Sequence, residues 1–267
     1  MTRRFRISGA AVLLFPALLF AAEPGAPDLR TAAIVDLTHP FDEKTLYWPT
    51  SPSGFELKRL AYGETSGGWF YSSYSFCAPE HGGTHLDAPI HFARSGRTAD
   101  QIPSRQLIAP AAVIDVARQA EKDPDYRLTA ADVRAWESRH GTVPAGAIVL
   151  LRTGWGKRWP DRKRYFGDDT PNDATKLHFP SYGKEAAELL VRGRRVGALG
   201  VDTASIDVGA STDFIVHQVA LGAQVPGLEN VANLEQVPES GAWVIALPMK
   251  IAGGSGAPLR IVAVVPK

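Results

Sequence analysis

The sequence predicts a single α/β domain built on a mixed sheet. Short apolar runs with the length and composition of strands occur along the chain, and segments of helical character lie between several of them. No internal repeat, low-complexity tract or interior linker divides the sequence. The 267 residues are enough to bury one sizeable core. Together these three observations favour one domain over several small ones.

The first strands are expected close to the N-terminal end of this domain. Residues 32–37 form a short apolar run, residues 55–60 alternate apolar and polar like a half-buried strand, and residues 69–76 are rich in aromatic strand formers. Further strands are expected, in chain order, at residues 112–116, 147–151, 195–201, 242–247 and 259–265. The run at 147–151 is apolar throughout, which is typical of a strand buried on both faces.

Helices are expected between the later strands. Thr129 has the position of an N-cap, and an acidic residue, Asp132, follows three residues later. Two more helices are expected at residues 184–191 and 214–222. Strands and helices therefore interleave in the second half of the chain, whereas the first half is mostly strand and loop.

The first 22 residues have the order of a secretory signal. Three arginines lie within the first six residues, residues 10–20 are apolar apart from one proline, and two alanines follow. The stretch is too short for a spanning helix, which favours an export signal over a membrane anchor. Residues 2–7 also resemble a twin-arginine signal. We therefore expect a signal peptide at 1–22, a linker at 23–30 and the domain at 31–267, in a periplasmic or secreted protein without stable membrane insertion.

Charge and motif content disfavour several classes of function. The formal net charge is +1 and no run of five or six like charges occurs, which argues against nucleic-acid binding and against a polybasic membrane patch. No Walker A loop or helix-opening GxGxxG is present, and the glycine-rich residues 253–257 do not complete a nucleophile elbow. The one cysteine, Cys77, lies in an apolar stretch and is expected to be a small buried residue and not a nucleophile.

The residues best suited to chemistry lie within residues 79–92. His81, His85, Asp87 and His91 are four potential metal ligands within eleven residues. All four have odd numbers, so in an extended strand they would lie on one face. Three of the seven histidines of the chain fall in this window, which favours a metal site over ordinary core or surface histidines. Two imidazoles and one carboxylate suit a divalent transition ion such as Mn or Zn, with positions left open for water.

The length of this segment requires it to bend if its histidines are to meet. In a straight strand, His81 and His91 would be roughly 33 Å apart, which no single site can span. The glycine pair at residues 82–83 and Pro89 are the positions that permit corners. The same glycine pair stands where a zinc-protease helix would carry its glutamate, so that motif does not fit. The sequence therefore predicts a curled strand that gathers its histidines around one place.

The spacing His81-x-Gly-Thr-His85-x-Asp87-x-Pro-x-His91 resembles the signature of the cyclase/arylformamidase family, which includes bacterial kynurenine formamidases and isatin hydrolases. The resemblance extends over nearly all of the chain after the signal, through a Trp-Pro pair at residues 48–49 and a closing segment at residues 247–260. It implies the swivelling β/β/α fold of the family, a cyclase-like single α/β domain with a mixed sheet. It also implies assembly as a homodimer or homotetramer.

The same resemblance implies roles for individual residues. It places two overlapping sets of metal ligands on the chain, one formed by His81, His85 and Asp87 and the other by Asp87, His217 and Glu229. His91 would be the catalytic acid/base. Taken without the resemblance, His217 on an apolar helix face reads as a core residue and Glu229 as a surface charge. Some relatives work with a single Mn ion, so one ion or two, and Mn or Zn, both remain open.

Within the family, several short segments resemble the isatin-hydrolase-like branch, at residues 66–71, 152–155, 178–180, 202–207 and 253–256. The implied function is metal-dependent hydrolysis of a carbon–nitrogen amide bond in a small aryl substrate, by opening of a cyclic amide. The alternatives are an arylformamidase acting on N-formylkynurenine in tryptophan catabolism, or a non-catalytic periplasmic metal- or ligand-binding module. Trp48, Trp69, Phe70 and Trp155 are candidates to contact a planar aryl substrate, and core packing is the alternative for each.

Overall fold

The computed structural model describes residues 27–267 of the chain. The expected signal peptide at residues 1–22 lies outside the described residues, as does the first part of the expected linker at 23–30. Among the described residues, no helix has both the length and the apolar character that a membrane span requires. The described part of the chain is α/β with a mixed sheet, as the sequence predicts.

Eight strands form the main sheet, in the order β1-β12-β11-β5-β7-β9-β10-β4. Their bounds are β1 Ala33–Asp36, β4 His85–Asp87, β5 Ile108–Asp115, β7 Ile148–Arg152, β9 Ala198–Val201, β10 Gly227–Glu229, β11 Trp243–Pro248 and β12 Gly256–Val265. β12 also pairs with β4, so every strand of this sheet except β1 lies in a closed ring. The neighbours β5, β7, β9 and β10 are parallel, whereas the other pairs are antiparallel.

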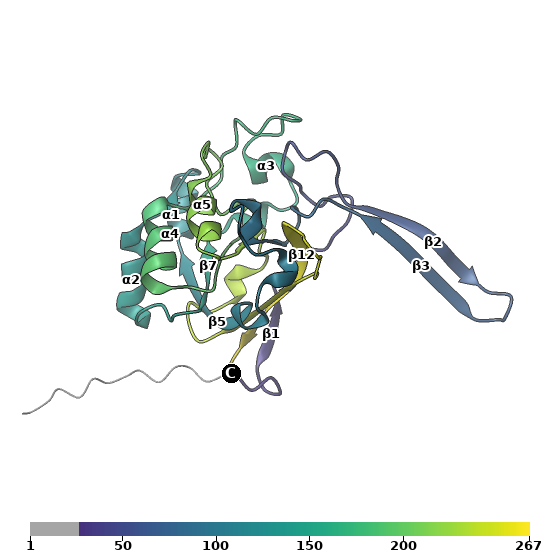
Figure 1. The fold of residues 1–267 in the computed structure, drawn as a ribbon, viewed down its shortest axis with the longest axis horizontal. Coiled ribbons are helices and arrows are strands. Elements are labelled where there is room, and N and C mark those ends of the chain that lie inside the picture. The colour runs from purple at the N-terminus through teal and green to yellow at the C-terminus, as the bar shows by residue number, and fades with distance from the viewer. Residues whose placement is uncertain (1–26) are drawn as a thin grey trace, which may run out of the picture.

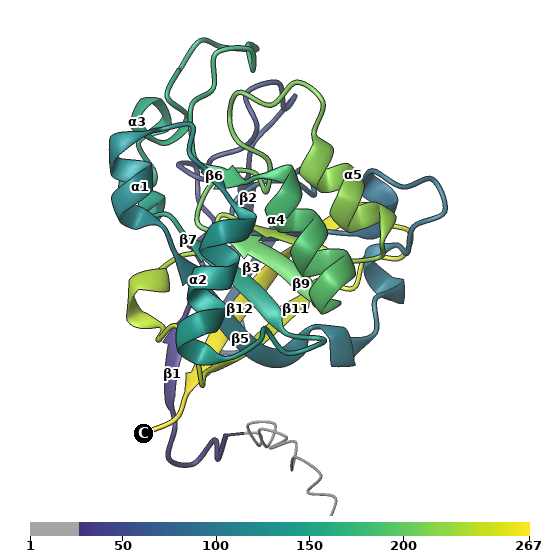
Figure 2. The same ribbon diagram turned by 90° about the vertical axis from the view of Figure 1, so that its left-hand side faces the viewer.

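The helices α1, α2, α4 and α5 gather on one outer side of this ring, and α3 lies apart from them (Figures 1 and 2). Their bounds are α1 Ala117–Lys122, α2 Ala130–His140, α3 Arg162–Phe166, α4 Lys184–Glu188 and α5 Ile215–Gly222, and a π-helical turn, Leu189–Arg194, continues α4. Shorter 3-10 turns lie at Pro89–His91, Ala99–Gln101, Ser104–Gln106, Trp155–Arg158 and Leu234–Gln236. The expected N-cap is confirmed, because Thr129 accepts a hydrogen bond from the Asp132 backbone N–H and the Asp132 side chain accepts one from Thr129.

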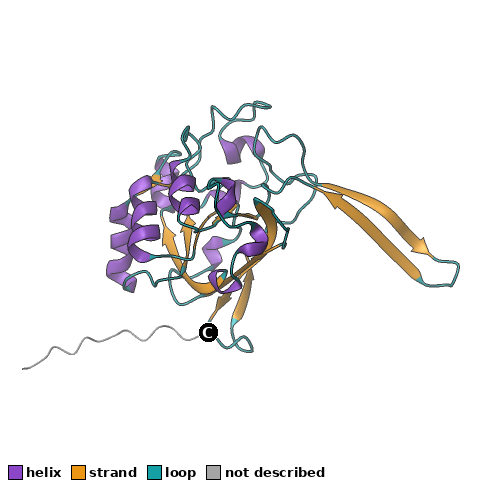
Figure 3. Cartoon of the chain, in the orientation of Figure 1, coloured by secondary structure: helices purple, strands orange, loops and turns teal. Residues whose placement is uncertain are grey.

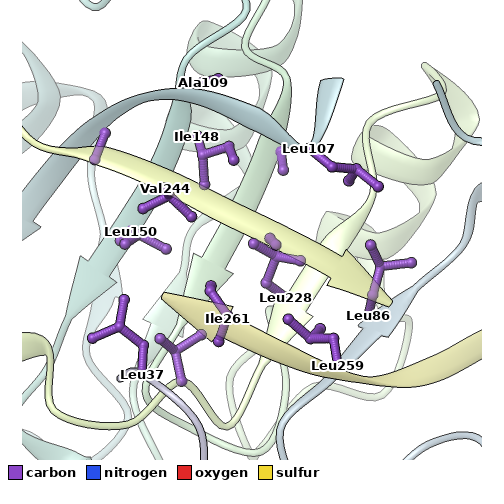
Figure 4. Packing of buried hydrophobic residues seen from close by; sticks show 14 of the residues in the cluster. Leu37, Leu86, Leu107, Ala109, Ile148, Leu150, Leu228, Val244, Leu259 and Ile261 are labelled. Atoms are coloured by element: carbon purple, nitrogen blue, oxygen red, sulfur yellow. The ribbon is translucent and has the colours of Figure 1, made fainter. Parts of the chain in front are cut away.

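Two apolar layers meet at the ring. Ile148 and Leu150 of β7 point into a cluster that fills the inside of the ring (Figure 4). Val149 and Leu151 point outward into a second cluster, which the helices α2, α4 and α5 cover. The prediction of a strand buried on both faces at residues 147–151 is therefore confirmed. The closed inner core makes the ring a rigid support for the ends of its strands.

A hairpin of two strands, β2 (Glu56–Glu64) and β3 (Phe70–Cys77), projects from this body (Figures 1 and 3). Two predictions are wrong here: the strand expected to be half-buried at 55–60 is almost entirely exposed, and so is Cys77. The physical reason is that, within residues 27–267, β2 and β3 pair only with each other, and their side chains stay exposed on both faces of the hairpin. A further small pair, β6 (Arg127–Leu128) and β8 (Ser181–Tyr182), is parallel.

Candidate metal centre

The potential ligands come together where three short strands meet. β4 pairs antiparallel with both β10 and β12. Within the first of these pairs, Glu229 of β10 is directly opposite His85 of β4, and Asp87 lies two residues further along β4. Directly opposite residues share a face of the sheet, as do alternate residues of one strand. His85, Asp87 and Glu229 therefore project to the same side, and all three side chains are buried.

The first corner of the predicted curl lies at the glycine pair. Gly82 and Gly83 have φ angles of 158° and 58°. Gly83 is thus in the left-handed region, and neither position has room for a side chain. A Cβ atom would lie 2.1 Å from the Tyr47 ring at Gly82, and 2.6 Å from the Phe41 ring at Gly83. The structure confirms that these two residues let the chain bend before β4.

The second corner is the 3-10 turn Pro89–His91, which follows directly on β4. Proline suits the start of such a turn because its φ is already fixed near the helical value. The turn brings the ring of His91 onto that of His81, with the ring centres 3.9 Å apart and the planes at 21°. Of the four odd-numbered residues, only His85 and Asp87 lie on β4. The predicted curl brings the other two to the same place.

Asp87 lies at the centre of the cluster. Its Oδ1 is 2.6 Å from His81 Nδ1 and 3.2 Å from His85 Nε2. Its Oδ2 is 3.1 Å from His217 Nε2, which is 3.3 Å from Glu229 Oε1. The donor atoms lie within 4.8 Å of one another in each set of three residues, one with His81, His85 and Asp87 and one with Asp87, His217 and Glu229. One carboxylate that turns an oxygen to each set has the geometry of a bridging ligand, and imidazole and carboxylate donors suit a divalent transition ion.

The histidines of the first set are also held at their outer ring nitrogens. His85 Nδ1 donates to the carbonyl of Gly83 at 3.0 Å, which leaves Nε2 to face the cluster. His81 Nε2 lies 2.9 Å from Ser255 Oγ, and that hydroxyl donates to the Glu80 carboxylate at 2.6 Å. Contacts of this kind fix both the tautomer and the orientation of a metal-binding imidazole.

The partners of the outer nitrogens were not identified from the sequence. Ser255 is 174 residues from His81 in the chain, so no local pattern connects them. Asp207, which lies 2.6 Å from His217 Nδ1, precedes that histidine by ten residues across a loop. Glu80 adjoins the histidine segment, but its target Ser255 is visible only in the fold. Spacing in the sequence can identify candidate ligands that lie on one segment. The residues that hydrogen-bond to their outer nitrogens lie on segments far away in the chain, and only the fold shows them.

Burial and charge oppose each other in this cluster. Burial lowers the pKa of His85, but the hydrogen bond and charge of Asp87, with the charge of Glu229, outweigh it and raise the pKa to about 9. Burial also lowers the pKa of His217, and hydrogen bonds to carboxylates outweigh it and raise the pKa well above its usual value. Burial and the charge of Asp87 raise the pKa of Glu229. Two buried carboxylates thus attract positive charge strongly, which fits the binding of a divalent cation.

His91 lies beside both ligand sets and belongs to neither. Burial lowers its pKa to about 4, so its imidazole is neutral near pH 7. It lines a cavity of about 290 Å³ that opens onto the ligands. A neutral imidazole in this position is able to accept a proton from a group that reacts in the cavity.

Aromatic side chains form much of the remaining cavity wall. Trp48 lines it together with Phe92, Phe166 and Phe214. Its indole packs edge-on against Phe166, with the ring centres 6.4 Å apart, and lies 6.3 Å from the ring centre of Phe214. An aromatic wall beside a polar floor suits a planar aryl ligand. Of the four aromatic residues proposed from the sequence, the structure brings Trp48 to the cavity.

The other three candidates lie elsewhere in the structure. Trp155 is 2 % exposed, packs in an aromatic cluster behind the cavity, and donates from Nε1 to the carbonyl of Tyr165 at 2.8 Å. Trp69 immediately precedes β3 and Phe70 begins it, both are exposed, and neither lines the cavity of its own chain. These residues were candidates because they lie near site segments in the sequence. In the structure, the hairpin places Trp69 and Phe70 away from the body of the domain.

Comparison with known proteins gives consistent matches over most of the chain. The Cyclase family model matches residues 35–208. The isatin hydrolase of Roseibium aggregatum is 34% identical over 220 residues, which is 79% of this chain and 81% of that protein. The kynurenine formamidase of Salinibacter ruber is 31% identical over 186 residues, which is 68% of this chain and 74% of that protein.

A solved structure shares the whole architecture. The crystal structure of an isatin hydrolase bound to the product analogue thioisatinate matches with a TM-score of 0.82 and 31% sequence identity. The match covers 89% of this chain and 94% of that chain. The two chains thus share the same fold over most of their length.

Proposed function

Since this chain belongs to the cyclase family, we propose that it is a metal-dependent hydrolase that cleaves a carbon–nitrogen amide bond in a small aryl substrate, by opening a cyclic amide such as isatin. The observation that carries the proposal is the position of His91, a neutral imidazole in the cavity wall beside two sets of metal ligands. The aromatic wall around Trp48 supports an aryl substrate. Similarity to isatin hydrolases supports the cyclic amide.

The proposed cofactor is Mn or Zn, as one ion or two. The first ion would be held by His81, His85 and Asp87, and a second by Asp87, His217 and Glu229, as the donor geometry supports. A divalent ion in such a site supplies Lewis acidity and lowers the pKa of water towards roughly 7. Each of these side chains is turned inward by the fold, so the site needs little rearrangement to bind the ion.

The remaining chemistry falls to residues of the cavity. His91 would accept the proton of the attacking water at its imidazole and return it to the departing nitrogen, a role worth about 10²–10⁴ in rate. Trp48 would hold the aryl ring against the wall formed by Phe166 and Phe214. With the aryl ring bound, the same aromatic residues would limit the access of bulk water, which strengthens the electrostatic interactions within the cavity.

Purified protein loaded with Mn or with Zn is expected to hydrolyse isatin faster than N-formylkynurenine. Product formation from each substrate, followed by absorbance, gives the two kcat/KM values. Faster hydrolysis of N-formylkynurenine would favour the arylformamidase alternative, which the match to kynurenine formamidases supports. Stable metal binding with no turnover of either compound would favour the non-catalytic binding module.

We further propose that the protein is a homodimer or homotetramer. The support is the β2–β3 hairpin, which stands away from the body (Figure 1). Its exposed large apolar residues are Leu57, Leu60, Tyr62, Trp69, Phe70, Tyr71, Tyr74 and Phe76. A lone two-stranded ribbon is marginal in water, and so many exposed apolar side chains on one hairpin are typical of an interface. A second copy of the chain would cover it.

Replacing Leu57 and Phe76 together with threonine is expected to shift the protein to a monomer. The two residues are directly opposite each other in the hairpin, so the change removes one apolar pair and keeps residues that favour strands. Light scattering after gel filtration measures the mass. The control is Lys58→Thr on the opposite face of the same strand, which should leave the assembly intact. A double variant that keeps the mass of the unaltered assembly would contradict this role of the hairpin.

We also propose that residues 1–22 export the protein to the periplasm or the medium and are then removed, by a general or a twin-arginine route. The support is the order of charged, apolar and small residues in the sequence. N-terminal sequencing of protein recovered from a periplasmic fraction tests this proposal.

A further inference from the structure

Asp207 is a buried carboxylate outside both sets of metal ligands. It is 2 % exposed, lies in the loop after β9, and is directed at the start of helix α5. Its Oδ2 lies 2.6 Å from His217 Nδ1 and also accepts the backbone N–H of His217 at 3.0 Å. Its Oδ1 accepts the backbone N–H of Val216 at 3.0 Å. A single carboxylate thus contacts both the ring and the backbone of one histidine.

These contacts fix the direction of the His217 ring. Because two backbone N–H groups hold the carboxylate, it cannot rotate independently of the first turn of α5. A neutral ring that donates from Nδ1 to this carboxylate must present its Nε2 lone pair on the opposite edge. That edge faces Asp87 Oδ2 at 3.1 Å and Glu229 Oε1 at 3.3 Å. Asp207 therefore sets the tautomer of the His217 ring and the direction in which its Nε2 points.

Helix capping alone would account for part of this arrangement. The residue at the N-cap position of α5, Phe214, makes no side-chain cap hydrogen bond, so the first N–H groups of the helix need another acceptor. Asp207 accepts two of them, through Val216 and His217. A cap does not require the third contact, the short one to the imidazole ring. The ring contact is the feature that points beyond helix stability.

We propose that Asp207 is a positioning residue for metal binding. It would hold the His217 ring so that Nε2 can bind the ion of the second ligand set. The inference rests on the proposed metal-dependent function. Carboxylates in this position typically contribute 10–100-fold to metal affinity. The three histidines would thus be supported in three different ways: His85 by a backbone carbonyl, His81 by a hydroxyl, and His217 by a full negative charge.

Two variants weaken the ring contact to different degrees. Asp207→Asn keeps the size of the side chain, but it has no negative charge and one acceptor oxygen in place of two, so it cannot accept from the ring, the Val216 N–H and the His217 N–H together. Asp207→Ser is too short to reach either the ring or the backbone N–H groups, so it removes all three contacts. The matched control is Asp202→Asn, which changes another buried carboxylate of the same segment. Asp202 accepts from Thr153 and makes no hydrogen bond to any of the histidines.

Titration of the metal-free full-length protein with Zn²⁺ alone, followed by calorimetry, measures the effect. We expect Asp207→Asn and Asp207→Ser each to weaken zinc binding that involves His217 by about 10–100-fold. Asp202→Asn should bind zinc like the unaltered protein, even if it unfolds at a lower temperature. Wild-type zinc affinity in Asp207→Ser would overturn the proposal.

A spectrum of the zinc-loaded protein, labelled with ¹⁵N at histidine, reports the tautomer without any substrate. The unaltered protein and Asp202→Asn should show the Nδ1 proton of His217, and Asp207→Ser should lose that signal. Persistence of the signal in Asp207→Ser would overturn the proposal. Zinc binding without hydrolysis of either aryl amide would contradict the proposed activity but not the proposed role of Asp207. Failure of the one proposal can therefore be distinguished from failure of the other.

Discussion

Replacing His91 with alanine is expected to reduce hydrolysis by about 10²–10⁴-fold, the usual contribution of a general acid/base, while metal binding is kept. The separation of the two effects follows from the geometry. His91 contributes to neither set of ligands, although its ring stacks on that of His81 at 3.9 Å. Because burial holds its pKa near 4, the imidazole is a neutral proton acceptor throughout the neutral range. Alanine removes this acceptor and leaves both donor sets in place.

The measurement pairs kcat for isatin with the metal content of the same preparation. His178→Ala is the matched control, because that histidine is exposed, pairs with Asp125 on the surface, and does not line the cavity. It should retain both activity and metal. Full activity in His91→Ala would remove His91 from the mechanism. Loss of metal along with activity would show instead that His91 acts as a ligand.

The histidine segment shows how far sequence alone leads. The parity of the residue numbers and the positions of glycine and proline were enough to predict a curl that gathers His81, His85, Asp87 and His91. The prediction worked because all these residues lie on one short piece of chain, where reach is limited by covalent geometry. It erred on the strand itself, which extends only over His85–Asp87 before the chain turns.

The distal candidate ligands, His217 and Glu229, could not be found in this way. Glu229 lies beside His85 because β10 and β4 are neighbours in the closed ring, and that pairing joins segments far apart in the chain. On its own, Glu229 follows a short apolar run and reads as a surface charge. Only the resemblance to a family implied that Glu229 and His217 join Asp87 in one ligand set, because residue spacing gives no sign of it. Contacts between distant strands depend on the whole topology, which residue spacing does not determine.

The hairpin shows the converse difficulty. Alternation of apolar and polar residues predicts a strand, and β2 and β3 are strands. The same alternation was expected to mean half-burial, which the described chain does not provide. Aromatic residues in this segment were therefore assigned to the cavity or to the core, and they lie on a projecting arm. Apolar patterning indicates that a strand face favours burial. It does not indicate whether the same chain or a partner provides the covering surface.

Replacing Asp87 with asparagine is expected to remove metal and activity together. Asp87 turns one oxygen to each ligand set and is buried among three histidines, His81, His85 and His217. Asparagine keeps the shape but has no negative charge, and its NH₂ group would face one of the sets as a donor. Loss of the ion's contribution to charge stabilisation, several kcal/mol, corresponds to a rate loss on the order of 10³-fold or more.

Comparison with Glu229→Gln decides how many ions Asp87 serves. Glu229 belongs only to the second set, so its loss should leave the ion held by His81, His85 and Asp87 in place. If two ions bind, metal analysis should fall from about two per chain to one in Glu229→Gln and to none in Asp87→Asn. If one ion binds at the first set, Glu229→Gln should keep it, and Asp87→Asn should lose it. Retention of bound metal by Asp87→Asn would contradict both arrangements, because each one depends on that carboxylate.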